Sequence, residues 1–155
     1  MSFLARPLTV FRRVAIAEAI TWALLLLGMV LKYVTHTTDL GVRVFGMLHG
    51  IVFITYVVTT TLVWIDQRWT ARRGFGALAA SIPPFVTYLE ERRATRDAWI
   101  GASWRLREPS ATIRSLPERA AHWVLIAPLR GLVAALIAIA ALTGIALLVG
   151  PPASS

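Results

Sequence analysis

The sequence predicts an all-α protein, a polytopic helix bundle in a membrane. The 155-residue chain is 57% hydrophobic and 15% charged, whereas soluble domains carry about a quarter charged residues, so much of its surface should face lipid. Long apolar runs alternate with arginine-rich segments. The basic residues that give the net charge of +8 lie mostly between those runs, which is typical of charge that flanks a membrane rather than of a surface that binds nucleic acid.

The first element is a transmembrane helix over residues 14–31. As a helix this run is about 28 Å long, close to the hydrocarbon thickness of a bilayer. Its length and the single acid Glu18 inside it favour a retained anchor over a cleaved signal peptide. Arg6, Arg12 and Arg13 precede it, and the positive-inside rule therefore places the N-terminus in the cytoplasm.

The second element is a returning helix over residues 44–65, which carries no formal charge. Because the polar loop at 35–41 is short, the two spans should pack as an antiparallel hairpin. Gly46 and Gly50 have the small-xxx-small spacing that allows close contact between helix backbones. The arginines of the following loop, 66–73, return the chain to the cytoplasm.

The third apolar run, residues 74–89, would reach only about 24 Å as a helix. Pro83 and Pro84 lie within it and interrupt the ladder of backbone hydrogen bonds. Two interpretations compete: a short, proline-kinked span, or a re-entrant segment that returns to the side it came from. We favour the kinked span, because irregular backbone in lipid needs protein to cover it, although the arginines that follow favour re-entry.

The rest of the chain is predicted to be a loop and a fourth span. Residues 92–106 mix tryptophans and arginines and fit either an interfacial amphipathic helix or a solvated linker. Ser115 has the features of a helix cap, and residues 131–149 form an uncharged final span. We thus expect a three-helix membrane domain at 1–93, an arginine-rich loop at 94–119, and a C-terminal transmembrane helix and tail at 120–155.

Four side chains form a candidate intramembrane polar site: Glu18, Lys32, His49 and Tyr56. Ionisable groups inside a membrane often have functional roles. Glu18 could bind a proton or a head group, but we favour a structural role. It would either hydrogen-bond to a threonine, with Thr59 to Thr61 placed at a similar depth by the antiparallel hairpin, or be exposed to water near the interface. Lys32 is expected to extend to the interface, near His49. His49 is expected to be a packing histidine, with Tyr56 on the same helix face.

Several kinds of chemistry lack the residues they need. The chain has no cysteine, which excludes disulfides, thiolate metal sites and thiol nucleophiles. His49 has no second ligand at metal-binding spacing, and no nucleophile elbow or phosphate-binding glycine loop occurs. We therefore assign no catalytic residue, metal or cofactor, and we favour a non-enzymatic role while leaving activity open.

A set of motifs between residues 11 and 93 resembles a family of small bacterial integral membrane proteins, common in high-GC Gram-positive bacteria and classed as a domain of unknown function. The motifs are Phe11 to Glu18, Leu31-Lys32-Tyr33, Leu48-His49-Gly50 with Phe53 and Tyr56, and Ser81 to Phe85 around Pro83 and Pro84. The resemblance implies a compact bundle of about three helices. It implies no activity, and residue 94 onward lies outside it.

The sequence therefore predicts a multi-pass protein of the bacterial cell membrane that acts as a partner subunit or a lipid-contacting module. Its expected partners are the bilayer, through anionic head groups, and a membrane protein or further copies of itself, but not nucleic acid. The alternative is a proton-coupled or small-solute carrier that acts as an oligomer, with Glu18 and His49 lining the path. An enzyme acting on lipid is disfavoured for want of catalytic groups.

Overall fold

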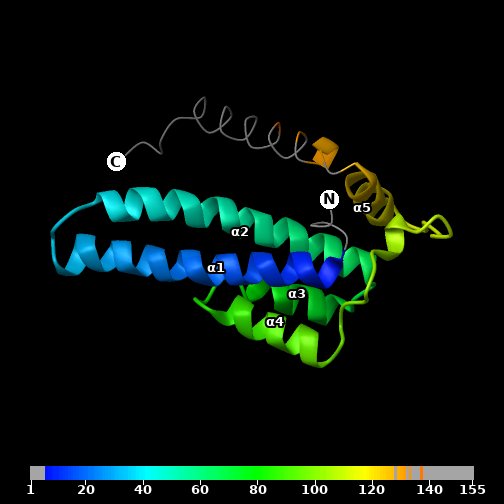
Figure 1. Ribbon diagram of the computed structural model, residues 1–155, viewed down its shortest axis with the longest axis horizontal. Helices are drawn as coiled ribbons and strands as arrows, with labels where there is room; N and C mark the ends of the chain where they lie inside the picture. The colour runs from blue at the N-terminus through cyan, green and yellow to red at the C-terminus, as the bar shows by residue number, and fades with distance from the viewer. Residues whose placement is uncertain (1–5, 128, 132, 134–136, 138–155) are drawn as a thin grey trace, which may run out of the picture. The chain divides into compact units, whose positions relative to one another are not determined.

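The computed structural model describes residues 6–127, 129–131, 133 and 137, and these residues form helices and connecting segments without any strand. The chain forms two compact units, residues 1–105 and residues 106–155. In the first unit, α1 (Pro7–Met29) and α2 (Leu40–Asp66) make a long antiparallel hairpin (Figure 1). Within the described residues, two helices, 7–34 and 40–66, are long and apolar enough to cross a membrane. The all-α class and the predicted hairpin are thus found in the structure.

The turn of the hairpin brings two glycines into backbone contact. α1 continues into the π-helical turn η1 (Val30–Val34), and α2 begins at Leu40. A Cβ atom added to Gly28 would lie 2.7 Å from the carbonyl carbon of Gly41, which is closer than a side chain tolerates. The hairpin is therefore tightest beside its loop, where neither residue has a side chain.

The glycine pair predicted from spacing does not make this contact within the chain. A Cβ atom at Gly46 would meet only the Leu25 side chain, at 3.8 Å, and one at Gly50 would meet nothing within 4 Å. Gly46 and Gly50 therefore do not bring the two hairpin helices together, and their role in helix packing stays a prediction. Their spacing puts them on one helix face, but it does not say which face meets the neighbouring helix.

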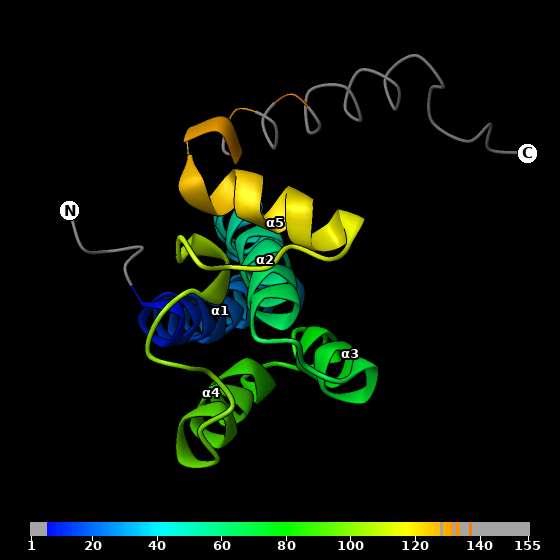
Figure 2. The ribbon, with the colours of Figure 1, turned by 90° about the vertical axis from the view of Figure 1, so that its right-hand side faces the viewer.

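The third apolar run is two short helices, α3 (Ala71–Ala79) and α4 (Val86–Arg96), and not one kinked helix. Figure 2 shows α3 beside α2 and α4 beside α1. Pro83 and Pro84 lie in the intervening turn and supply no backbone N–H, and Phe85 takes a left-handed conformation with φ 66°. The chain therefore reverses its direction at the prolines, between α3 and α4. The single proline-kinked span that we favoured is wrong.

The core of the first unit lies at the end of the hairpin that α3 and α4 cover (Figure 1). Phe11 is fully buried, 5.9 Å from the ring of Tyr56 and 6.2 Å from the ring of Trp69 between centroids. Every buried residue of α2 lies at or beyond Tyr56. The other half of α2, residues 40–55, has no buried residue.

The segment after α4, residues 97–105, closes the same end of the hairpin as a strap of turns and bends. The Trp69 indole donates to the Trp99 carbonyl at 2.9 Å, and the Arg105 guanidinium donates to the Asp66 carbonyl at 2.8 Å. Ile100 and Trp104 are buried. Neither of the two interpretations of residues 92–106 is correct, because α4 ends at Arg96, and Ile100 and Trp104 beyond it are buried outside any helix.

The second unit contains one described helix of more than a turn, α5 (Leu116–Ile126), which follows the 3-10 turn η2 (Arg105–Arg107). The predicted cap is confirmed, since the Ser115 hydroxyl accepts from the Glu118 backbone N–H. The Glu118 carboxylate in turn accepts from the Arg114 N–H at 2.7 Å. Most of the predicted final span, residues 131–149, lies outside the described residues.

Candidate functional site

Glu18 is fully buried on α1, where the sequence placed a candidate polar site. Its carboxylate oxygen Oε2 accepts a 2.5 Å hydrogen bond from the hydroxyl of Thr87, the second residue of α4. The threonine partner that we expected on α2 is therefore wrong in position, although right in residue type. The other oxygen, Oε1, has no hydrogen-bond partner in the part of the chain that the structure describes.

His49 lies on the neighbouring part of α2, against Trp22 of α1. The Thr21 hydroxyl donates its proton to the Glu18 carbonyl at 3.0 Å and lies 3.1 Å from His49 Nδ1. The Thr21 hydroxyl thus links the backbone of α1 to the His49 ring on α2. The histidine ring also packs on the Trp22 indole, with 4.6 Å between centroids. His49 is therefore a bonded and packed residue in this structure.

Tyr56 and Trp22 hydrogen-bond to the backbone where α3 ends. The Tyr56 hydroxyl donates to the Ala77 carbonyl at 2.9 Å, and the Trp22 indole N–H donates to the Ser81 carbonyl at 3.4 Å. The last carbonyls of a helix have no partner within the helix, and the Ser81 N–H bonds to the Leu78 carbonyl instead of the Ala77 carbonyl. The hairpin helices thus supply the donors that the break between α3 and α4 lacks.

Lys32 does not join the other predicted site residues. It lies in η1, where its ammonium is 5.2 Å from the centroid of the Tyr33 ring. His49 bonds to Thr21, which is several turns from Lys32 along α1. The four predicted residues therefore form no single site. Glu18, His49 and Tyr56, with their hydrogen-bond partners, form one buried polar layer between the helices. Lys32 lies apart from it, near the loop of the hairpin.

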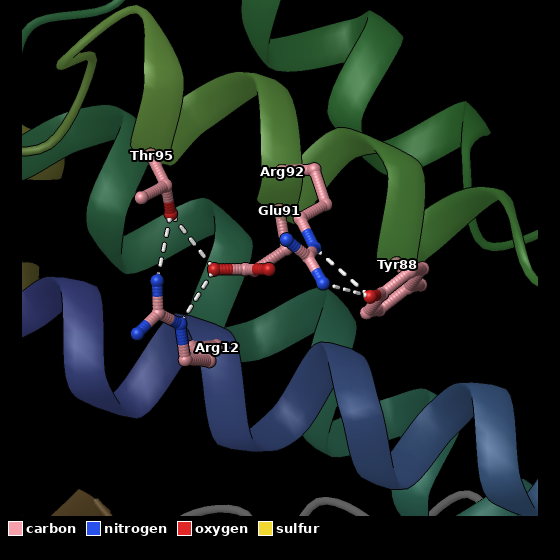
Figure 3. Close-up of polar contacts among 5 residues, drawn as sticks. All are labelled: Arg12, Tyr88, Glu91, Arg92 and Thr95. Carbon is pink, nitrogen blue, oxygen red and sulfur yellow. Dashed lines mark hydrogen bonds and ion pairs between the residues drawn. The ribbon is translucent and has the colours of Figure 1, made fainter.

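A second group of polar residues, absent from the sequence prediction, joins α1 to α4 (Figure 3). The Arg12 guanidinium bonds to the Glu91 carboxylate at 2.7 Å and to the Thr95 hydroxyl at 3.2 Å. Thr95 also donates to Glu91 at 2.8 Å. The Glu91 side chain is only 2% exposed, whereas Arg12 is 47% exposed. A buried carboxylate is thus held by an arginine that still reaches the surface.

The outer face of α4 carries further arginines. Arg92 donates to the hydroxyl of Tyr88, one turn earlier, and lies over the Tyr88 ring. This hydrogen bond raises the pKa of the Arg92 guanidinium above its usual value. Arg96 bonds to Asp97 at 2.7 Å, and the bond holds the pKa of the Asp97 carboxyl below its usual range. Both arginines therefore stay charged under all ordinary conditions.

Neither group of residues resembles a catalytic or metal centre. Within the described residues, no three histidine, aspartate or glutamate side chains lie close enough together to hold a metal ion. The buried layer consists of hydrogen bonds between helices, and its one carboxylate can gain or lose a proton. The arginine-rich end can bind anions.

The sequence pointed to polar residues that form bonds in the structure, but it did not show which residues they bond to. Thr87 is 69 positions from Glu18, and Glu91 is 79 positions from Arg12. Helical periodicity relates residues three or four apart, so it carries no signal for pairs at this separation. The one usable signal was Pro83 with Pro84, because a reversal there would place α4 antiparallel to α1.

Comparison with known proteins identifies relatives but no function. Residues 8–96 match a family model described as Domain of unknown function (DUF3817). A protein of Streptomyces coelicolor described as a putative membrane protein is 47% identical over 108 residues, which cover 69% of this chain and 12% of that relative. The chain thus spans about an eighth of the length of that relative. No solved structure matches.

Proposed function

Because the chain belongs to the family described as Domain of unknown function (DUF3817), we propose its role from its surface: it is a non-enzymatic module that packs against a larger membrane protein. The observation that carries the proposal is the division of α2. All its buried residues lie at or beyond Tyr56, while residues 40–55 bury none. The large apolar residues exposed in this half are Leu40, Val44, Met47, Leu48, Ile51 and Ile54.

Two features of this half favour a protein neighbour. Gly50 lies on it with open space at its Cα atom, and a Cβ atom at Gly46 would meet only the Leu25 side chain, at 3.8 Å. Small residues let a second helix approach closely in lipid. The Streptomyces relative supports the kind of neighbour, because there the matching segment is 12% of a larger protein described as a membrane protein. A segment that is fused to a larger membrane protein in one relative can bind a protein of that kind when it is a separate chain.

The topology that we propose has two spans and a re-entrant pair. α1 and α2 cross the bilayer, while α3 and α4 enter from the end that holds Pro7 and Asp66 and return to it. Irregular backbone at membrane depth needs bonded carbonyls and protein cover, and Tyr56 and Trp22 provide the bonds. Arginines gather at that same end, which makes it cytoplasmic by the positive-inside rule. This arrangement keeps the strap on the cytoplasmic side.

Single cysteines test this topology, because the chain has none of its own. We expect a membrane-impermeant maleimide to label Thr38→Cys in intact cells. Ala71→Cys and Ala102→Cys should be labelled only after the cells are permeabilised. Labelling of Ala102→Cys from outside would mean that the third segment crosses the bilayer.

The partner role is tested with the Streptomyces relative. A tagged form of that protein, with its matching segment deleted, is co-expressed with this chain, and the two are purified together in a mild detergent. We expect a stoichiometric complex. Ile51→Trp, on the unburied half of α2, should abolish it. Ile20→Trp on α1 is the matched control, since Ile20 and Ile51 are exposed to similar extents, 56% and 58%.

Two results would contradict the partner role. One is that the chain elutes without the truncated relative. The other is that it forms a dimer that Ile51→Trp converts to a monomer, because a second copy of the chain would then occupy the α2 face.

A proton-coupled carrier is the second candidate, and one observation favours it. Glu18 is buried in the candidate span, and its Oε1 atom has no hydrogen-bond partner among the described residues. Such a carboxylate can accept a proton. A path through the bilayer needs polar groups at several depths, and Lys32 lies apart from Glu18 and His49, so the partner role accounts for more of the molecule. Glu18→Gln in a proton-flux assay with reconstituted vesicles distinguishes the two.

A further inference from the structure

A groove of about 760 Å³ lies between α1 and α4 at the arginine-rich end of the first unit. The residues that matter here are Arg12 and Ile16 from α1 and Tyr88, Leu89, Arg92 and Arg96 from α4. Figure 3 shows Arg12 reaching across from α1 and Arg92 folded toward Tyr88 on α4. The groove is a feature of neither the buried polar layer nor the unburied half of α2.

The groove has an excess of positive charge. Four arginines line it, against the single carboxylate of Glu91, and that carboxylate is buried beneath Arg12. Arg93 and Arg96 are paired with Glu90 and Asp97, which lie outside the lining. The bonds of Arg92 go to the Tyr88 hydroxyl and not to a carboxylate. Among the residues that the structure describes, the lining arginine that no carboxylate pairs with is therefore Arg92.

The groove is also polar at one end and apolar at the other. Ile16 lies one helical turn beyond Arg12 on α1, and Leu89 lies one turn before Arg92 on α4. Since α1 and α4 run in opposite directions, both apolar residues lie deeper in the hairpin than the arginines. Ile16 and Leu89 are 38% and 52% exposed, so their side chains are available to a ligand.

We propose that this groove binds one anionic phospholipid, with its phosphate on Arg92, Arg12 and Arg96 and an acyl chain along Ile16 and Leu89. The planar guanidinium group donates two parallel hydrogen bonds to a phosphate, and within the described part of the chain no carboxylate bonds to Arg92 in competition. A free phosphate would use the arginines but would gain nothing from the apolar residues. The partner role proposed above rests on other residues, so either proposal can fail alone.

The test uses the full chain in nanodiscs of phosphatidylcholine with a minor fraction of phosphatidylglycerol. Native mass spectrometry after release from the disc counts the lipids that stay bound. We expect one retained phosphatidylglycerol, preferred over phosphatidylcholine by about tenfold. Both lipids carry the phosphate, but the arginines repel the quaternary ammonium of phosphatidylcholine. Arg92→Gln should remove most of the preference, and Arg92→Lys should keep only part of it.

Three controls make the outcome decisive. Arg72→Gln removes the same charge from an exposed site at the same end of the hairpin, outside the groove, and should leave lipid retention unchanged. Leu89→Gln should weaken retention, because it removes part of the acyl-chain contact. Inorganic phosphate should not displace the bound lipid at millimolar concentration.

Each opposite result contradicts the proposal. If Arg72→Gln and Arg92→Gln lost equal amounts of bound phosphatidylglycerol, the positive end of the protein would attract anionic lipid diffusely, without a specific site. Displacement by inorganic phosphate together with no effect of Leu89→Gln would identify a free-anion site. Equal retention of the two lipids by the unaltered protein would remove the site altogether.

Discussion

Replacing Gly28 with alanine tests where the hairpin is tightest. The new Cβ atom would lie 2.7 Å from the carbonyl carbon of Gly41 and 2.9 Å from the backbone nitrogen of Val42. Both are backbone atoms, which cannot turn aside as a flexible side chain could, so the two helices must separate. Overpacking of this kind costs about 1–3 kcal/mol.

The same substitution also favours the helical backbone, so the net change in the free energy of unfolding is the difference between the two effects. Alanine is favoured over glycine within a helix by about 1 kcal/mol. We therefore expect Gly28→Ala to lower the free energy of unfolding by up to about 2 kcal/mol. Gly50→Ala is the matched control: nothing lies within 4 Å of its new Cβ atom, so only the gain of about 1 kcal/mol should appear.

The assay is a titration of the purified protein from a mild detergent into sodium dodecyl sulfate, with unfolding followed by tryptophan fluorescence and circular dichroism. The chain has 6 tryptophans, which gives a strong signal. The two variants should differ in opposite directions from the unaltered protein. Equal stability of Gly28→Ala and Gly50→Ala would refute the assignment of the close contact to Gly28 and Gly41.

Three further predictions use the same titration. Glu18→Gln should leave stability nearly unchanged, because an amide keeps the size and hydrogen-bonding capacity of the acid, whereas Glu18→Leu should lose about 1–3 kcal/mol; a destabilised Gln variant would show that the charge itself is needed for folding. Tyr56→Phe should cost about 1–3 kcal/mol by leaving the Ala77 carbonyl without its donor, and an unchanged midpoint would contradict that role. Arg12→Gln should cost about 1–2 kcal/mol by stranding the carboxylate of Glu91, and adding Glu91→Gln should recover part of the loss, so additive losses would argue against the pair.

Some of the polar residues were identifiable from sequence because a membrane makes them conspicuous. Glu18, His49 and Tyr56 stand out within apolar runs, and all three make buried or half-buried bonds in the structure. What the runs could not show was the bonding partner. From sequence, Thr87 belongs to one kinked helix. Only the reversal at Pro83 and Pro84 in the structure places it beside Glu18.

The helix faces that meet in the hairpin could not be predicted from the sequence either. Gly46 and Gly50 have the spacing of a close helix contact, but helix rotation decides which stripe meets the neighbour, and in a membrane both lipid and protein accept the same apolar side chains. The contact fell instead on Gly28 and Gly41, which lie on different helices and share no spacing.

The all-α class, the hairpin and the cap at Ser115 could be predicted from the sequence. Each follows from local rules: apolar length against bilayer thickness, a short polar loop, and the hydrogen bonding of a helix start. The tertiary structure alone decided that the third segment turns back, that Arg12 and Glu91 meet, and that a groove opens between α1 and α4. These features depend on contacts between residues about 80 positions apart, and they form only when α4 packs antiparallel to α1.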